Sequence, residues 1–421
     1  MGYLALEENA KRQSFRYVDL CAGIGGFHQA MKSLGGECVG AAEVDDSCVN
    51  TYQANYPSTL MLGDITNIDN PSDLPTFDLV CAGFPCQPFS KAGKQLGFKD
   101  GSRGKLFFSI LDIIDAHSET KGFIFENVRN LADNKKNWSV ICDELKRRDF
   151  IITEDPLILS PSDFGIPQKR ERVFILGIKR RDRDQRVLPN SKITEADLDL
   201  RKTSCERNAA LCILDKDVDG AFAVAPDVEE ALLAWDEFRS GTGIKTIGFP
   251  IWLSHFGIGV NRDSDFFEMI GINEMPSWKR NYLRHNRHFY HIHRDFIDNW
   301  VEQYRMNDRN KLLQKFEWNC GADVPDIKHG LIQIRQSGVR VKRPDLFPTL
   351  VAMRNTPIVW DEGMGHFRRI TTKEAAKLQS FDSDYRFVES DNQTYRQLGN
   401  AVNVEIARQL GKGLLHLLRK E

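Results

Sequence analysis

The sequence predicts an α/β fold, with an open parallel sheet covered by helices on both faces and a second domain inserted into it. From residue 15 to about 180, short apolar segments alternate with segments whose apolar residues recur at helical spacing. Most of the short segments are apolar throughout, which is typical of parallel strands buried on both faces. The alternation stops after Gly177 and returns at about residue 343.

Each element of the first part is predicted from its own local pattern. Apolar residues at helical spacing over 27–34 indicate a helix that ends at the glycines 35–36, and a helix over 49–56 is closed by Pro57. The same spacing predicts helices over 105–116 and 138–145. The predicted strands are 15–23, 37–44, 59–62, 77–83, 122–127, 151–159 and 172–177.

The middle of the chain has a different character. A charged run, KRRDRDQR, opens it and is typical of a solvated linker, and the residues that follow mix Gly, Asp and aromatic side chains irregularly. Helical patterns return over 371–381 and 402–420. We therefore expect a first domain over 1–182, an inserted domain over 183–342, and a segment over 343–421 that completes the first domain.

The composition limits the class of protein. Hydrophobic residues make up 41% and charged residues 28%, as in ordinary globular proteins, and no apolar run approaches the ~18 residues of a membrane span. We expect a cytoplasmic protein without a membrane partner. Nine cysteines without Cys-x-x-Cys spacing argue against a disulfide framework and a zinc ribbon, and we predict no metal. The net charge of −2 means that a nucleic-acid binder must concentrate its positive charge locally.

Polar groups follow the first three predicted strands. The turn DLCAGIGGF joins a strand to a helix through glycines that let the backbone approach a ligand closely. Glu43 ends the second strand, where a carboxylate can accept hydrogen bonds from ribose hydroxyls, and Asp64 follows the third. Either acid alone is more often a solvated loop residue. Together with the glycine turn, they indicate a site for a single nucleoside.

Cys86 follows the fourth strand, at the edge where ligands bind in open sheets. A thiolate there is a strong nucleophile if the local field lowers its pKa. Residues 91–105 carry five basic residues against one acid, a net +4 that suits a phosphate-facing loop. Glu126 closes the next strand, and Arg170 and Arg172 immediately precede another. The pattern favours a pocket that holds a nucleophile beside an acid.

The motifs DLCAGIGG, GFPCQPFS, FENV, QKRERVFILG and QLGNAV resemble, in order and spacing, those of the cytosine-5 DNA methyltransferases. The resemblance implies a Rossmann-like, S-adenosylmethionine-dependent methyltransferase domain with a smaller, variable target-recognition domain formed by the middle region. It implies that Cys86 attacks C6 of a flipped-out cytosine, that Glu126 engages N3 and that Arg172 anchors the base near O2. Cys21 is a departure, because the family usually has phenylalanine at this position.

The resemblance also assigns residues to cofactor and DNA. The catalytic set comprises Cys86, Glu126, Arg170 and Arg172. The implied cofactor-binding residues are Asp19, Cys21, Ala22, Gly23, Ile24, Gly25, Gly26, Glu43, Val44, Asp64, Ile65, Gly83, Pro85, Asn400 and Val402. The implied DNA contacts are Gln87, Ser90, Lys91, Lys94 and Arg103, with Arg335, Gln336 and Arg340 as candidate base or phosphate contacts in a recognition loop.

The expected partner is double-stranded DNA, with a cognate restriction endonuclease acting on the same site, and we expect a monomer in the cytoplasm of a bacterium or of a phage host. A transfer-RNA cytosine methyltransferase of the same fold and a catalytically silent DNA-binding relative are the alternatives. Residues 275–294 carry five Lys or Arg, no acid and interleaved aromatic residues. Such a segment is either a polar helix face or a contact to the DNA backbone.

Overall fold

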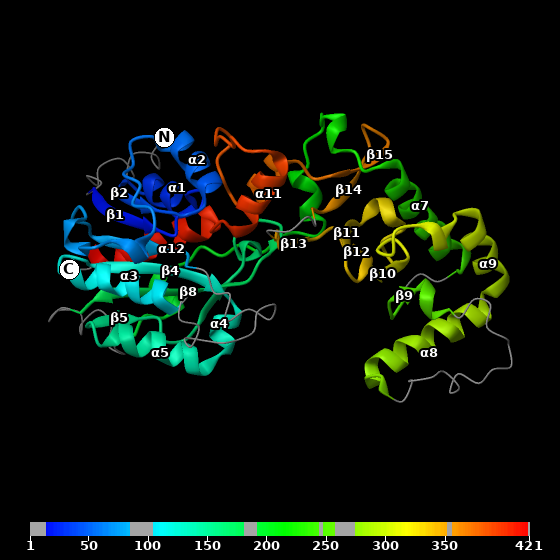
Figure 1. The fold of residues 1–421 in the computed structure, drawn as a ribbon, viewed down its shortest axis with the longest axis horizontal. Helices are drawn as coiled ribbons and strands as arrows, with labels where there is room; N and C mark the ends of the chain where they lie inside the picture. The colour runs from blue at the N-terminus through cyan, green and yellow to red at the C-terminus, as the bar shows by residue number, and fades with distance from the viewer. Residues whose placement is uncertain are drawn as a thin grey trace, which may run out of the picture. The chain divides into compact units, whose positions relative to one another are not determined.

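The computed structural model describes residues 14–84, 104–180, 192–243, 247–256, 274–351 and 356–419. The chain divides into two compact units (Figure 1). Unit 1 comprises Met1–Cys205, Thr349–Ala352 and Ala375–Glu421, and unit 2 comprises Glu206–Pro348 and Met353–Glu374.

Unit 1 is built on a sheet with the strand order β2-β1-β3-β4-β8-β5, in which β6 also pairs with β8. The strands β1 to β4 run parallel, so their carboxyl ends meet at one edge. The register places Leu20 beside both Ala42 and Ala82, which makes these ends level. The strands are β1 (Phe15–Leu20), β2 (Gly36–Ala42), β3 (Leu79–Ala82), β4 (Gly122–Val128), β5 (Phe150–Ile152), β6 (Leu157–Leu159) and β8 (Arg172–Lys179).

Two expectations for this sheet are wrong. The sheet is mixed, because β8 runs antiparallel to β4, β5 and β6. The connection from β5 to β8 holds only short strands and a 3-10 turn, and an antiparallel pair does not need a crossover helix. The predicted strand 59–62 is reduced to one bridge between Ala41 and Met61, since the chain turns away at Gly63 with a positive φ of 65°.

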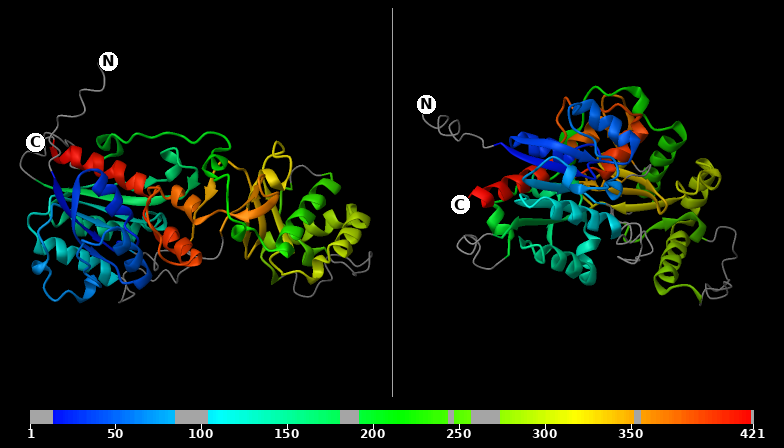
Figure 2. Two further views of the ribbon diagram at one scale, coloured as in Figure 1. Left: turned by 90° about the horizontal axis from the view of Figure 1, so that it is seen from above. Right: turned by 60° about the vertical axis from the view of Figure 1, so that its left-hand side comes forward.

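Helices cover both faces of the sheet (Figure 2). On one face, α3 and α5 bury Ile110 and Ile141 in a core shared with Val80 and Phe123 of the strands. On the other face, α12 packs against α1, although the two come from opposite ends of the chain. The helices of this part are α1 (Gly26–Ser33), α2 (Asp46–Asn55), α3 (Gly104–Ala116), α4 (Asn130–Asp133), α5 (Lys135–Lys146), α10 (Thr372–Leu378), α11 (Asp391–Asn400) and α12 (Val404–Arg419).

Unit 2 has a sheet and a core of its own, where the sequence predicts a helical stripe over 289–304 in an otherwise irregular region. The sheet has the order β15-β14-β11-β12-β10-β9. Trp235 stacks on Phe316 with ring centroids 4.9 Å apart and packs against Trp300 at the same distance. The elements are α7 (Pro226–Gly241), β9 (Ile251–Trp252), α8 (Ser277–Ile292), α9 (Arg294–Gln303), β10 (Lys315–Asn319), β11 (Leu331–Arg335), β12 (Gly338–Lys342), β14 (Ile358–Asp361) and β15 (His366–Arg369).

Candidate active site

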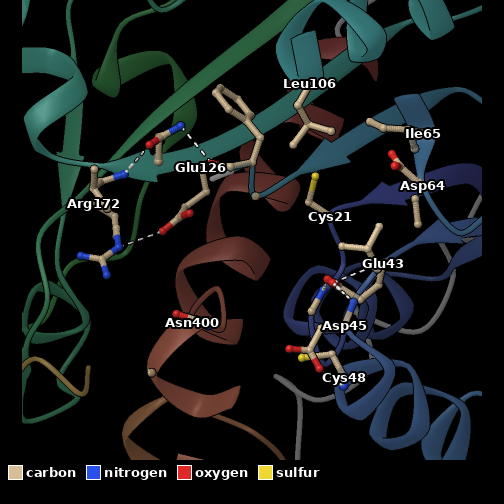
Figure 3. Close-up of a pocket in the computed structure, with 18 of the residues that line it drawn as sticks. Cys21, Glu43, Asp45, Cys48, Asp64, Ile65, Leu106, Glu126, Arg172 and Asn400 are labelled. Atoms are coloured by element: carbon tan, nitrogen blue, oxygen red, sulfur yellow. Dashed lines mark hydrogen bonds and ion pairs between the residues drawn. The ribbon is translucent and has the colours of Figure 1, made fainter. Parts of the chain in front are cut away.

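A pocket of about 610 Å³ lies within unit 1, at the carboxyl ends of β1 to β4 (Figure 3). Such a volume suits a small organic ligand. Of the residues assigned to cofactor and catalysis, those that line the pocket are Cys21, Gly23, Glu43, Val44, Asp64, Ile65, Gly83, Glu126, Arg170, Arg172 and Asn400. The described assigned residues that do not line it are Asp19, Ala22, Ile24, Gly25, Gly26 and Val402, which belong to or adjoin the surrounding turns.

The glycine turn after β1 approaches its neighbours too closely for larger residues. Gly25 has φ +82°, and a Cβ there would lie 2.8 Å from the ring of Tyr56. A Cβ on Gly26 would lie 2.3 Å from the carbonyl oxygen of Val402. The absence of side chains therefore lets the turn and the start of α1 pack tightly behind the pocket.

Glu43 organises the backbone at the rim of the pocket. Its carboxylate accepts hydrogen bonds from the N–H groups of Gly23 at 2.8 Å, Val44 at 2.8 Å and Asp45 at 2.9 Å. The side chain of Val44 beside it is 68% exposed, so an apolar surface is open next to a charged acceptor. This combination suits a ligand with hydroxyl groups on one part and an apolar ring on another.

The cysteine that departs from the family pattern is a neutral part of the pocket wall. Cys21 has a left-handed backbone with φ 58°. Burial, reinforced by the carboxylates of Glu43, Asp19 and Asp64, raises the pKa of the Cys21 thiol well above its ordinary value. At neutral pH this sulfur is therefore a thiol, which packs as a small hydrophobic group.

One pocket residue that the sequence did not single out, Asp45, holds the start of α2. Asp45 accepts hydrogen bonds from the N–H groups of Ser47 at 3.0 Å and Cys48 at 3.2 Å, which caps the helix. The hydrogen bond from the Ser47 hydroxyl lowers the pKa of Asp45, so its carboxylate stays ionised. An acid immediately before a helical pattern is the signal that would have identified this residue. Asp64 caps the turn that follows it in the same way, by accepting from Thr66 N at 2.8 Å.

An acid and a cation face each other at the other end of the pocket. The Glu126 Oε1 atom lies 3.1 Å from Arg172 Nε (Figure 3). Glu126 is only 9% exposed, and burial raises its pKa even though Arg172 and Arg170 act in the opposite direction. The next residue, Asn127, donates from Nδ2 to the Phe84 carbonyl at 3.1 Å and so holds the chain just before Pro85. This edge of the sheet therefore presents a carboxyl with a raised pKa beside a guanidinium.

Arg170 lines the same pocket, but its guanidinium is occupied by the protein backbone. It is 2% exposed, and it donates to the carbonyls of Leu350 at 3.0 Å, Gly399 at 2.9 Å and Ala401 at 2.9 Å. The Gly399 and Ala401 carbonyls flank Asn400, and all three belong to late segments of the chain that return to unit 1. Arg170 therefore connects the strand that begins at Arg172 to the opposite wall of the pocket.

A family model described as C-5 cytosine-specific DNA methylase matches residues 15–219 and 264–416. The chain belongs to this family. Type II methyltransferase M.AluI of Cellulosimicrobium cellulans is 30% identical over 490 residues, covering 96% of this chain and 91% of that protein. Type II methyltransferase M.HgiCI of Herpetosiphon aurantiacus is 30% identical over 426 residues, covering 93% and 96%. The crystal structure of S. pombe Dnmt2 methyltransferase shares the fold, with a TM-score of 0.53, 16% identity and coverage of 97% and 100%.

The comparisons confirm the family and the Rossmann-like α/β class that the motifs predicted. Membership makes the chain a methyltransferase of the cytosine-specific DNA methylase type. Within the described residues of this methylase, no helix is long and apolar enough to cross a bilayer. In the same ranges, no group of three or more His, Cys, Asp or Glu side chains could hold a metal ion, and the histidines of 285–293 are no exception.

Part of the predicted site of this methylase lies outside the described residues. That part comprises Pro85, Cys86, Gln87, Ser90, Lys91, Lys94 and Arg103. Their assignments remain predictions from the sequence.

The candidate recognition residues of the methylase lie in unit 2, on a two-residue hairpin between β11 and β12. Arg335 ends β11, and Gln336 is exposed at the tip. Arg340 lies on β12, where its Nε is 2.5 Å from Glu317 Oε2 on β10. Arg340 is therefore held by an ion pair along the sheet, whereas Gln336 is presented to solvent.

Proposed function

We propose that the chain is a DNA (cytosine-5)-methyltransferase that transfers a methyl group from S-adenosyl-L-methionine to C5 of a flipped-out cytosine in a specific duplex sequence. The observation that carries the proposal is the Glu126–Arg172 pair at the sheet edge, beside a pocket with a carboxylate at its rim. Unit 2 is proposed to be the target-recognition domain.

The pocket residues fit the proposed cofactor. Glu43 would accept the ribose hydroxyls, and Asp64, Ile65 and the exposed Val44 would line the adenine side. The bound cofactor supplies an electrophilic methyl group. The small, neutral Cys21 leaves this wall without an aromatic ring, so the aliphatic residues and the hydrogen bonds must provide the affinity.

The chain's own residues activate the base. Cytosine C5 is a poor nucleophile, and addition of the Cys86 thiolate at C6 makes C5 enamine-like. Glu126, whose raised pKa favours the protonated form, donates its proton towards N3 as charge develops there, and Arg172 holds O2. After C5 has taken the methyl group, the C5 proton is lost to solvent and the thiolate departs, and the proton on N3 returns to Glu126, which restores the enzyme. The base must leave the duplex to reach these groups.

The test uses the full chain with cofactor that carries a labelled methyl group. Duplex DNA and transfer RNA are incubated separately, and nucleosides from each digest are analysed by mass spectrometry. We expect 5-methylcytosine in the DNA alone. Label in the transfer RNA alone, or methylation of a different atom, would overturn the proposal.

We further propose that the chain protects DNA from a restriction endonuclease with the same target. Support comes from the relatives named above, which are Type II methyltransferases, and the pairing is inferred from them. Bisulfite sequencing of DNA from an expressing host would define the target. DNA methylated there should then resist an endonuclease of that specificity, and cleavage at the wild-type rate would contradict the pairing.

A further inference from the structure

The cations of unit 2 fall into two groups. Several are paired with acids, among them Arg340 with Glu317 and Arg309 with Glu230. Others have no ion pair with an acid in the described part of the chain, among them Lys279, Arg280, Lys315 and Arg335. Cations without an acidic partner in the chain are available to an anion from outside it, and where they gather they can concentrate positive charge locally despite the net charge of −2.

Lys315 connects the hairpin tip to a tryptophan. Its Nζ lies 5.4 Å from the centre of the Trp252 ring and donates to the Gln336 carbonyl at 3.3 Å. Lys315 and Trp252 are register partners on β10 and β9. A Cβ on Gly338 would lie 2.3 Å from Lys315 Cβ, so the hairpin rests directly on this lysine.

Aromatic contacts continue from Trp252 to α8. The Trp252 ring centre lies 4.6 Å from that of His255 and 6.2 Å from that of Tyr282. Tyr282 in turn lies 5.7 Å from Trp278, which is 55% exposed at the start of α8. The hairpin tip, β9 and the first half of α8 are therefore parts of one continuous surface. We name it the basic aromatic surface, defined by Trp252, His255, Trp278, Lys279, Tyr282 and Lys315.

The electrostatics of this surface are one-sided. Helix α8 contains no acid over its whole length. The pKa of His255 is lowered to about 4 by burial and then by Lys279, Lys315 and Arg287. A histidine surrounded by cations stays neutral at physiological pH, so lysines and arginines alone set the charge, and a bound anion would relieve their repulsion.

We propose that the basic aromatic surface binds phosphates of the DNA backbone next to the bases that the β11–β12 hairpin contacts. The proposal rests on the proposed function, because it assigns part of the surface on which the substrate duplex lies. Lysine is a point charge suited to phosphate, and the ring of Trp252 restricts the positions that Lys315 can take. Phosphate contacts of this kind fix the register of the protein on DNA without selecting a sequence.

The test compares two double variants of the full chain with the same loss of charge. Lys279→Gln/Lys315→Gln removes two cations of the surface, and Lys216→Gln/Lys311→Gln removes two exposed cations of unit 2 that do not belong to it. Binding to a duplex of mixed sequence is measured by fluorescence anisotropy at several salt concentrations, because phosphate contacts do not require the target site. Each lost phosphate contact should reduce the log–log salt slope by roughly 0.9, so the first variant should lose about 1.8 and the second close to zero.

The outcomes separate the two proposals. If the wild type methylates DNA but both double variants keep its salt slope, or both slopes decrease by the same amount, the surface assignment is wrong and the proposed function is retained. If the slope falls as expected but the wild type methylates no DNA, the proposed function falls and the surface remains a DNA contact. If the double variant does not fold, as judged by its thermal melt, Lys279→Gln alone is used, and its slope should fall by roughly 0.9.

Discussion

Replacing Glu43 with alanine should weaken cofactor binding while leaving unit 1 folded. The carboxylate holds the Gly23 N–H at 2.8 Å in a partly buried position, whereas its bonds to Val44 and Asp45 are exposed, and water can replace them. The larger effect is on cofactor binding, because the ribose hydroxyls of the ligand would lose a charged hydrogen-bond acceptor. A hydrogen bond to a charged group contributes a net ~1.5–3 kcal/mol, so Kd should rise by about 10- to 150-fold.

The assay is isothermal titration calorimetry with S-adenosyl-L-homocysteine, the demethylated product, which cannot turn over. Glu37→Ala is the matched control, because Glu37 is exposed at the opposite end of the same strand. Glu43→Gln, which keeps an acceptor oxygen without the charge, should bind with intermediate affinity. A Kd for Glu43→Ala within twofold of the wild type, with a normal thermal melt, would show that Glu43 only organises the backbone.

Three further predictions concern the catalytic edge. Cys86→Ser should abolish methylation and leave cofactor binding nearly unchanged, because a hydroxyl is a far weaker nucleophile, and measurable turnover by a clean preparation would refute the role of Cys86. Because the pKa of Glu126 is raised in the folded chain, its proton contributes stability below the ordinary glutamate pKa, and this contribution is lost as pH rises through the folded pKa. Urea midpoints of the wild type should therefore fall between these two pKa values, whereas those of Glu126→Gln should not change. Arg170→Met should lower the melting temperature, because it leaves three buried carbonyls without donors. Arg170→Lys should restore the melting temperature only in part. Melting temperatures equal to that of the wild type would contradict the positioning role of Arg170.

Local pattern was enough to predict the polar groups at the strand ends. Glu43 and Glu126 both follow apolar runs, and parallel strands bring such ends to one edge whatever their exact length. The contribution of Leu106 to the pocket wall could not be predicted, because the sequence does not show whether a leucine on a helix faces the core or a ligand. The sheet of unit 2 was missed because strands as short as Ile251–Trp252 are too brief to show a period.

The direction of β8 is the point at which fold and chemistry constrain each other most strongly. Arg172 is the first residue of β8, and Glu126 lies near the end of β4. In a parallel pair the start of one strand lies at the far edge from the end of its neighbour, about 25 Å away for a strand of this length. Antiparallel pairing instead sets Val128 beside Arg172 and leaves 3.1 Å between the Glu126 carboxylate and the guanidinium.

The sequence analysis expected both an all-parallel sheet and a site that joins Glu126 to Arg172, and these two expectations exclude each other. Hydrophobic pattern cannot decide between them, since a buried strand is apolar in either direction. The chemistry can decide the strand direction. A carboxyl proposed to protonate a base and a cation proposed to hold the same base must lie at the same edge of the sheet. A residue pair required by one reaction therefore determines a strand direction that propensity leaves open, and the Glu126–Arg172 distance is the structural observation on which that argument depends.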